Sequence, residues 1–184
     1  MNRIIGIIVS TVIILFSTVS FAFAEELHWG FKKATDGNQI EISSELETML
    51  AKYDAMYRGD PQAKTIYLTF DNGYENGFTE RILDALKEED VPATFFLTGH
   101  YVTSASDLVK RMVKDGHIIG NHSDKHPNMA RLSEAQMLTE WQNFDKKLKE
   151  VTGLERTYYT RPPEGVYNET LLAVGAKNDY RHIF

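Results

Sequence analysis

Short apolar runs alternate with helix-period patterns along most of this chain. The runs are rich in β-branched and aromatic residues, which is typical of strands. They predict strands over residues 65–70, 93–97, 117–120, 157–160 and 181–184. Strands that alternate with helices at this spacing indicate βα units and a mostly parallel sheet. The pattern fits either an α/β barrel or an open doubly wound sheet.

Helical patterns fill the intervals between these strands. The predicted helices run from residue 44 to a Gly-Asp-Pro break at 59–61, over 79–89, over 104–115, over 133–151 and from residue 168. The segments SELE at 44–47 and SEAQ at 133–136 match capping boxes, in which side-chain oxygens accept hydrogen bonds from amides at the start of a helix. Residues 27–39 show no period and predict an irregular lead-in.

The first 24 residues form a separate apolar segment. Arg3 precedes an apolar run over residues 4–16, and AFA at 22–24 supplies small residues where a signal peptidase cleaves. We expect a secretory signal peptide over 1–24 that is cleaved after Ala24, and an uncleaved membrane anchor is the alternative. Cleavage would place the protein on the cell-wall side of the membrane. The remainder divides into a lead-in with one helix at 25–60 and a main domain at 61–184.

Composition narrows the class of protein. The chain has 184 residues, 42% hydrophobic and 25% charged, as expected for one soluble globular domain. The net charge of −6, without a clustered basic patch, argues against a nucleic-acid partner. No cysteine is present, which excludes disulfides, thiolate nucleophiles and Cys-ligated zinc. No glycine-rich phosphate-binding motif follows the first strand, so nucleotide binding has no support in the sequence. We expect a monomer without a protein partner.

Polar candidates follow the ends of three predicted strands. Asp71 and Asn72 come after the first strand, His122 and His126 after the third, and Arg161 after the fourth. In an α/β barrel, the carboxyl ends of the strands meet at one face, where sites form. We therefore expect these side chains to lie close together.

The spacing of the two histidines allows both to reach one metal ion. Imidazoles at i and i+4 suit zinc and similar divalent cations, although surface histidines also occur at this spacing by chance. A site with two histidines would need an oxygen ligand from Asp71 or Asn72. Arg161 precedes two prolines, which restrict its backbone, so it could orient Asp71 and keep it ionised. The alternative for Arg161 is an ordinary ion pair that closes a loop.

Taken together, these motifs resemble those of the NodB-type polysaccharide deacetylases, carbohydrate esterase family 4. The segments that carry the resemblance are TFDNG at 69–73, HSDKH at 122–126 and RPPEG at 161–165. The sequence is most similar to the spore-cortex branch, the peptidoglycan N-acetylmuramic acid deacetylases that prepare muramic δ-lactam. That closer similarity rests on Asn72 and on WGFK at 29–32, FFLTGH at 95–100 and GHIIGNHS at 116–123.

The resemblance implies a distorted parallel (β/α) barrel that removes N-acetyl groups from the glycan strands of peptidoglycan. It implies that Asp71 is the general base, and that Arg161 positions Asp71. His122 and His126 would bind a divalent metal ion, zinc or similar, with Asn72 as a weak third ligand. The loop that contains Pro163 and Gly165 would contact substrate and stabilise the oxyanion.

Two departures from the family pattern qualify this expectation. Most members have a second Asp where this chain has Asn72, although the muramic branch shares the Asn. The family also continues into an Asp-Trp motif and a Leu-x-His motif that carries the general acid, and this chain stops at Phe184 before both. We expect a barrel that is incomplete at its C-terminus. The alternatives are a chitin or N-acetylglucosamine deacetylase, a non-catalytic glycan-binding barrel and an inert fragment.

Overall fold

A curved parallel sheet forms the centre of the molecule. The computed structural model describes residues 25–35 and 37–184, so the signal peptide expected at 1–24 lies outside the described residues. The sheet has the strand order β2-β3-β4-β5-β7, and every neighbouring pair is parallel. Its strands are β2 (Thr69–Asn72), β3 (Thr94–Leu97), β4 (Ile118–Asn121), β5 (Tyr159–Thr160) and β7 (Arg181–His182).

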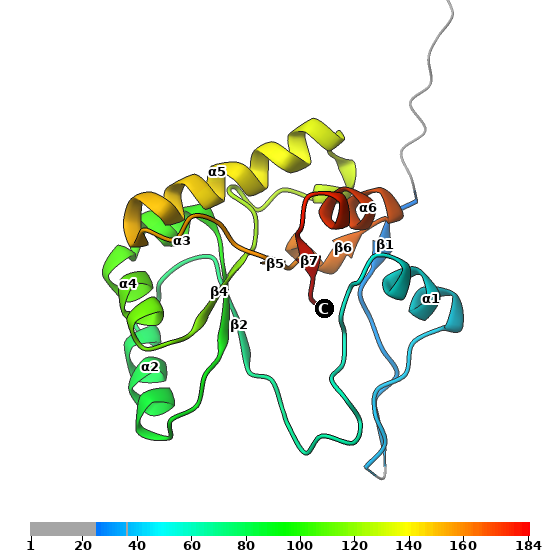
Figure 1. Cartoon of the computed structure of the whole chain (residues 1–184), viewed down its shortest axis with the longest axis horizontal. Helices are drawn as coiled ribbons and strands as arrows, with labels where there is room; N and C mark the ends of the chain where they lie inside the picture. Colours follow the sequence, from blue (N-terminus) through cyan, green and yellow to red (C-terminus); the bar gives the residue numbers. More distant parts are fainter. Residues whose placement is uncertain (1–24, 36) are drawn as a thin grey trace, which may run out of the picture.

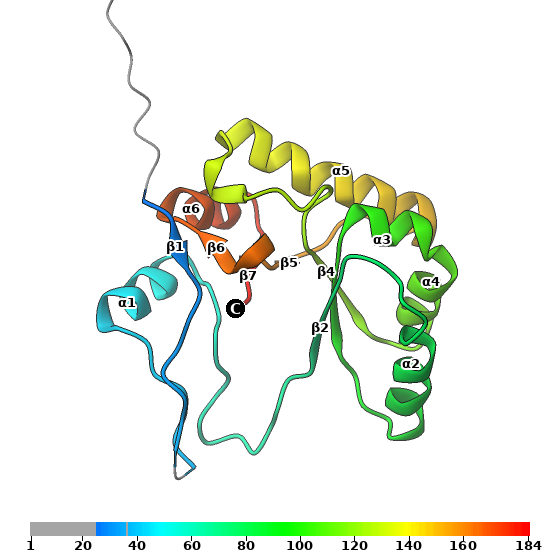
Figure 2. The ribbon, with the colours of Figure 1, turned by 180° about the vertical axis from the view of Figure 1, so that it is seen from behind.

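Helices α2 to α5 cover this sheet along one side, and α1 lies apart from them beside β1 (Figures 1 and 2). The α-helices are α1 (Ser44–Lys52), α2 (Thr79–Glu88), α3 (Gly99–Ser104), α4 (Ser106–Lys114), α5 (Glu134–Thr152) and α6 (Glu169–Lys177), and the 3-10 helices are η1 (Met129–Arg131) and η2 (Pro163–Gly165). Helices α2, α4 and α5 bury an apolar cluster against β3 that includes Leu83, Phe95, Met112 and Phe144. Among the described residues, no helix has the length and apolar character needed to cross a bilayer.

The curvature of the sheet is strong enough to bring its two ends together. In a flat sheet, β2 and β7 would lie about 19 Å apart, because neighbouring strands are about 4.8 Å apart. The guanidinium of Arg161 nevertheless donates hydrogen bonds to Thr69 of β2 at 3.0 Å and to the carbonyl of Ile183, directly after β7, at 3.2 Å. The expected α/β fold with a barrel-like parallel sheet is thus confirmed. Within the described residues, no strand closes the sheet between β7 and β2.

The first predicted strand was placed too early. Pairing between β2 and β3 begins at Thr69 and continues through Asn72, so Asp71 lies within the strand rather than after it. Ile66 and Tyr67 have high strand propensity, but they are 84% and 68% exposed and belong to no strand. The physical reason is that, among the described strands, β2 pairs with β3 alone, and β3 starts opposite Thr69.

The lead-in contains a strand that the sequence pattern did not predict. β1 (Leu27–His28) pairs antiparallel with β6 (Val166–Tyr167), which was also missed. The amide of Trp29 extends this pairing by donating to the carbonyl of Gly165 at 2.7 Å. Strands of two residues are too short to produce a hydrophobic period. This pairing fixes the lead-in beside the loop after β5.

Helix boundaries show where local signals succeed and fail. Ser133 and Gln136 form the predicted capping box of α5. At α1, however, the N-cap is Ser43, whose hydroxyl accepts from the Leu46 amide, and the helix ends at Lys52 instead of reaching residue 59. The predicted helix over 104–115 corresponds to α4, whereas α3, which Thr98 caps and which starts at Gly99, was not predicted.

Candidate active site

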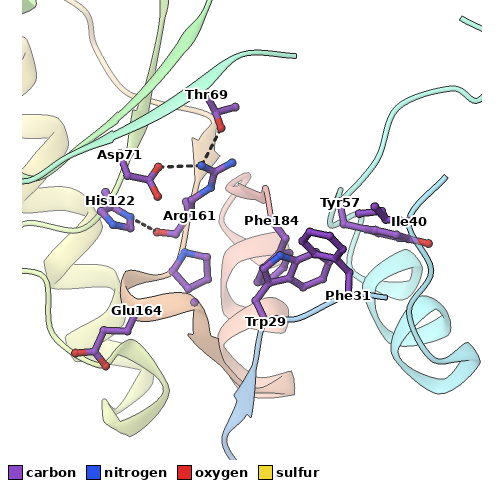
Figure 3. Close-up of a pocket in the computed structure, with 12 residues that line it drawn as sticks. Trp29, Phe31, Ile40, Tyr57, Thr69, Asp71, His122, Arg161, Glu164 and Phe184 are labelled. Atoms are coloured by element: carbon purple, nitrogen blue, oxygen red, sulfur yellow. Dashed lines mark hydrogen bonds and ion pairs between the residues drawn. The ribbon is translucent and has the colours of Figure 1, made fainter. Parts of the chain in front are cut away.

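Three of the predicted residues line one cavity at the carboxyl end of the sheet. Asp71 projects from β2, His122 directly follows β4 and Arg161 directly follows β5, and all three face a cavity of about 440 Å³ (Figure 3). The parallel register places these strand ends beside one another. The expected convergence of these three residues is therefore present.

Arg161 holds Asp71 in a fixed orientation. One guanidinium nitrogen donates to Oδ1 of Asp71 at 2.8 Å and to the hydroxyl of Thr69 at 3.0 Å, while Nε donates to the Ile183 carbonyl. The guanidinium also lies over the ring of Phe96, with 4.2 Å between its central carbon and the ring centroid. Because the Arg161 side chain is only 17% exposed and the Asp71 side chain 43%, the carboxylate remains open to the cavity.

His122 is oriented by the backbone of Arg161. Nδ1 of His122 lies 2.8 Å from the Arg161 carbonyl oxygen, and a carbonyl can only accept, so Nδ1 carries the proton. Nε2 is then the nitrogen with the free lone pair. Burial lowers the pKa of His122, and the hydrogen bond to the Arg161 carbonyl offsets part of that effect. The imidazole is therefore held neutral, as metal ligation requires.

His126 lies beside His122, with ring centroids 4.9 Å apart and the rings edge to face. Since zinc–nitrogen bonds are about 2.0–2.1 Å long, two imidazoles at this separation can reach one ion. The amide of His126 donates to the hydroxyl of Ser123 at 2.8 Å, which closes the loop between the two histidines. The predicted histidine pair is thus present as neighbouring rings.

Asn72 supplies the third potential donor. Its side-chain oxygen is buried and has no hydrogen-bond partner, while its backbone carbonyl accepts from the Thr98 amide at 3.1 Å. Such an orphaned oxygen needs a partner, and a cation can provide one. Within residues 25–35 and 37–184, no three His, Asp or Glu side chains gather closely enough to hold an ion. The neighbouring donors for a divalent ion are thus the two imidazoles, and Asn72, which lines neither the cavity beside His122 nor the one beside His126, stays a predicted third ligand.

The loop after β5 offers less for oxyanion binding than the sequence suggests. Pro163 is buried and lacks an N–H group, so it cannot donate a hydrogen bond. Gly165 lines the cavity, but its amide donates to the Pro162 carbonyl at 3.2 Å. Neither residue therefore offers a free backbone N–H to an oxyanion. The substrate and oxyanion contacts expected for Pro163 and Gly165 stay a prediction.

An aromatic wall forms the other side of the cavity. Trp29 stacks on Phe184 at 4.8 Å between ring centroids, and its ring lies 5.8 Å from that of Tyr57 and 6.3 Å from that of Phe31 (Figure 3). In the sequence, Trp29 and Phe31 belong to the WGFK segment at 29–32, whereas Tyr57 and Phe184 lie in no motif. No periodic pattern connects these residues, because the pairing of β1 with β6 places Trp29, and a bridge between Met56 and Ile183 places Tyr57 and Phe184.

A second cavity of about 480 Å³ lies on the His126 side. Gly73, Tyr74, Thr98, His100, Asp124, Lys125 and His126 line it. The ring of His100 lies here, 4.7 Å from that of exposed Tyr74. The histidine pair is therefore shared between two cavities, since His122 lines the first and His126 the second.

Comparison with known proteins places this arrangement in a family. A family model described as polysaccharide deacetylase matches residues 58–183. The chain is 52% identical to an uncharacterized 30.6 kDa protein of Geobacillus stearothermophilus, over 92% of this chain and 64% of the relative. It is 42% identical to the peptidoglycan-N-acetylmuramic acid deacetylase PdaA of Bacillus subtilis, over 87% of this chain and 61% of the relative. The chain thus spans less than two thirds of the length of these curated relatives.

Solved structures show the same relationship. The structure of Bacillus subtilis PdaA, a family 4 carbohydrate esterase, superimposes with a TM-score of 0.84 and 42% identity, covering 87% of this chain and 68% of the other. A family 4 pseudoenzyme from Bacillus anthracis superimposes with a TM-score of 0.66 and 31% identity, covering 71% of this chain and 46% of the other. The resemblance noted in the sequence is confirmed by these matches. The chain belongs to the polysaccharide deacetylase family.

Proposed function

We propose that this chain carries the catalytic face of a hydrolase that removes N-acetyl groups from peptidoglycan amino sugars. The observation that carries the proposal is the Asp71–Arg161 ion pair beside His122 in an open cavity. The similarity of the chain to the N-acetylmuramic acid deacetylase PdaA supports N-acetylmuramic acid as the sugar. Chitin or another N-acetylglucosamine polymer is the second candidate substrate.

Asp71 is the general base of the proposed reaction. It takes a proton from a water molecule whose oxygen attacks the carbonyl carbon of the acetamide. That proton then passes from Asp71 to the amide nitrogen as the C–N bond breaks, which releases the sugar amine and acetic acid, and the acid ionises to acetate. A positioned base typically contributes about 10²–10⁴ in rate. Arg161 holds the carboxylate through Oδ1. The positive charge of Arg161 also balances the negative charge of the Asp71 carboxylate.

The donor set around His122 is suited to a divalent ion. Family 4 carbohydrate esterases are metal-dependent deacetylases. His122, His126 and Asn72 would hold zinc or a similar ion, which when bound acts as a Lewis acid toward the acetyl carbonyl and lowers the pKa of water. The hydrogen bond from Nδ1 of His122 to the Arg161 carbonyl fixes the imidazole so that Nε2 is available to the ion.

The location of the substrate fits the leader. We propose that the apolar segment over residues 1–24 directs the protein across the membrane to the side where peptidoglycan lies. We also propose that the enzyme acts on the peptidoglycan of the spore cortex. The aromatic wall of Trp29, Tyr57 and Phe184 supports a sugar substrate, because aromatic rings pack well against the apolar faces of sugar rings. One glycan strand could occupy both cavities beside the histidine pair.

A glycan-binding role without catalysis is the alternative. The observation that favours it is Asn72, because a neutral amide is a weaker metal ligand than a carboxylate. A solved structure of a family 4 pseudoenzyme from Bacillus anthracis shows that the family includes pseudoenzymes. Retention of glycan strands without release of acetate would support this second function.

Acetate release separates the two functions. Residues 25–184 are incubated with zinc and with peptidoglycan glycan strands that contain N-acetylmuramic acid, and free acetate is measured over time. We expect release from the unaltered chain and at least a roughly hundredfold loss in Asp71→Asn. Equal rates in both proteins would contradict Asp71 as the base. Cooperative unfolding of both proteins, followed by circular dichroism, serves as the control for folding and excludes an inert fragment.

A further inference from the structure

The loop between the two histidines has a strained backbone. Ser123 and His126 have φ angles of 67° and 58°, in the left-handed region that residues with a side chain rarely adopt. Such conformations persist only where surrounding contacts enforce them. The positions of the two imidazoles therefore depend on what holds this loop.

Asp124, midway between the histidines, is buried and paired. Its carboxylate lies 2.6 Å from the ammonium of Lys147 on α5, and the side chain of Asp124 is only 3% exposed, against 35% for Lys147. The carboxylate fits because residue 99 is glycine: a Cβ there would lie 1.9 Å from Oδ1 of Asp124. The Gly99 amide also donates to the Ser123 carbonyl at 3.1 Å. Asp124 is thus enclosed between the start of α3 and the side of α5.

Other contacts fix the ends of the loop, but none fixes its middle through a side chain. The Ser123 amide donates to the side chain of Asn121 at 2.9 Å, and the Lys125 amide donates to the carboxylate of Glu140 at 2.8 Å. Among the described residues, the Asp124–Lys147 pair is the only ion pair made by this loop. Loss of the cation would leave the buried carboxylate uncompensated, and a shift of the loop toward water would relieve that cost.

We propose that Asp124 and Lys147 are positioning residues that hold His122 and His126 in the geometry required to share a divalent ion. This inference rests on the metal-assisted site of the proposed function. The pair lies outside the donor set, so it acts through the backbone of the loop. Binding sites require their groups to be held to within about 0.5 Å of the productive geometry. A contact from α5 can therefore affect the affinity for the ion although α5 supplies no ligand.

Zinc binding to variants of the chain over residues 25–184 tests the proposal. The affinity for Zn²⁺ is measured by calorimetry on Asp124→Asn, Lys147→Met and Gly99→Ala, the last of which displaces the carboxylate without altering charge. Lys149→Met is the matched control, because Lys149 lies on the same helix and pairs with Glu155 at the surface. The absorption spectrum of bound Co²⁺ provides a second readout, which reports the ligands directly.

We expect the three variants to lose roughly 10–100-fold in Zn²⁺ affinity, in the range measured for groups that support metal ligands, with an altered Co²⁺ spectrum. Lys147→Arg should retain most of the affinity, and Lys149→Met all of it. Unchanged affinity in Lys147→Met and Asp124→Asn would overturn the inference, as would an equal loss in Lys149→Met. If the unaltered chain binds no Zn²⁺, the metal site itself fails. If zinc binds equally to all variants, only the positioning role fails. Circular dichroism confirms that each variant is folded before its affinity is compared.

Discussion

The Arg161 carbonyl accepts a hydrogen bond from Nδ1 of His122 at 2.8 Å, and the Arg161 side chain donates to Asp71 at the same distance. A single residue therefore orients the proposed base with its side chain and the proposed metal ligand with its backbone. This arrangement allows the two functions to be separated by substitution, because a change of side chain leaves the carbonyl in place.

Arg161→Lys should reduce acetate release by roughly tenfold or more while leaving Zn²⁺ affinity within a factor of about three. Lysine keeps a positive charge but cannot contact Asp71, Thr69 and the Ile183 carbonyl together, because it lacks the planar fork of arginine. Acetate assays and zinc calorimetry on the same preparation provide the measurement. A parallel loss of zinc binding would show that the side chain, too, supports His122.

Asp71→Asn should be nearly neutral for stability. The Asp71–Arg161 pair is partly exposed, and pairs of this kind contribute about 0–1 kcal/mol to the free energy of unfolding. We therefore expect the urea midpoint to change little, while acetate release falls by roughly a hundredfold or more. A loss of several kcal/mol would mean that the substitution disrupts the fold, and the kinetic result could then not be assigned to the base.

Asn72→Asp should raise the affinity for the ion and lower the stability of the ion-free protein. The side-chain oxygen at this position is buried without a partner, and a carboxylate there would be a better ligand but a costlier buried charge. We expect Zn²⁺ affinity to rise by roughly tenfold and the thermal midpoint in EDTA to fall. The difference in midpoint with and without zinc is the measurement, and a smaller difference than in the unaltered chain would exclude Asn72 from the donor set.

His182 should make the protein less stable in mild acid. Its imidazole is fully buried, neither ring nitrogen has a hydrogen-bond partner, and burial lowers its pKa to about 3. Because the folded pKa lies below the unfolded value of 6.5, the unfolded chain gains a proton first as pH falls. Stability is therefore complete above about pH 6.5 and declines toward pH 3, by about 2 kcal/mol at pH 5.

His182→Leu removes this titration and isolates its effect. Urea unfolding at pH 8 and pH 5 should show a smaller decline in the variant than in the unaltered chain, since the other histidines remain in both proteins. His28→Gln, at an exposed position, is the control and should decline like the unaltered chain. Equal declines in all three proteins would remove His182 as the source of acid sensitivity.

The sequence predicted the site better than it predicted the strands that build it. Asp71, His122 and Arg161 could be placed together because each lies at the end of an apolar run, and parallel strands bring such ends to one edge. The start of β2 could not be placed, since Ile66 and Tyr67 have the propensity of strand residues but no neighbouring strand to pair with. Strand boundaries depend on the partner, which propensity does not contain.

The aromatic wall shows the other limit. Trp29 and Phe184 are separated by almost the whole described chain, and they stack because β1 pairs with β6 and β7 ends beside them. Contacts between distant residues that belong to no repeating pattern leave no local signal. The domain division at residue 60, the leader and the roles assigned to individual site residues stay predictions.

The reach of Arg161 has a consequence for the order in which the protein becomes competent. Its guanidinium contacts β2, the first strand of the sheet to be synthesised, and the residue after β7, the last. A chain that has left the ribosome but has not yet docked β7 lacks one of the contacts that orient this side chain. The orientation of Arg161, and through it that of Asp71, is therefore complete only when both β2 and β7 have docked. A partly folded molecule lacks a correctly oriented general base.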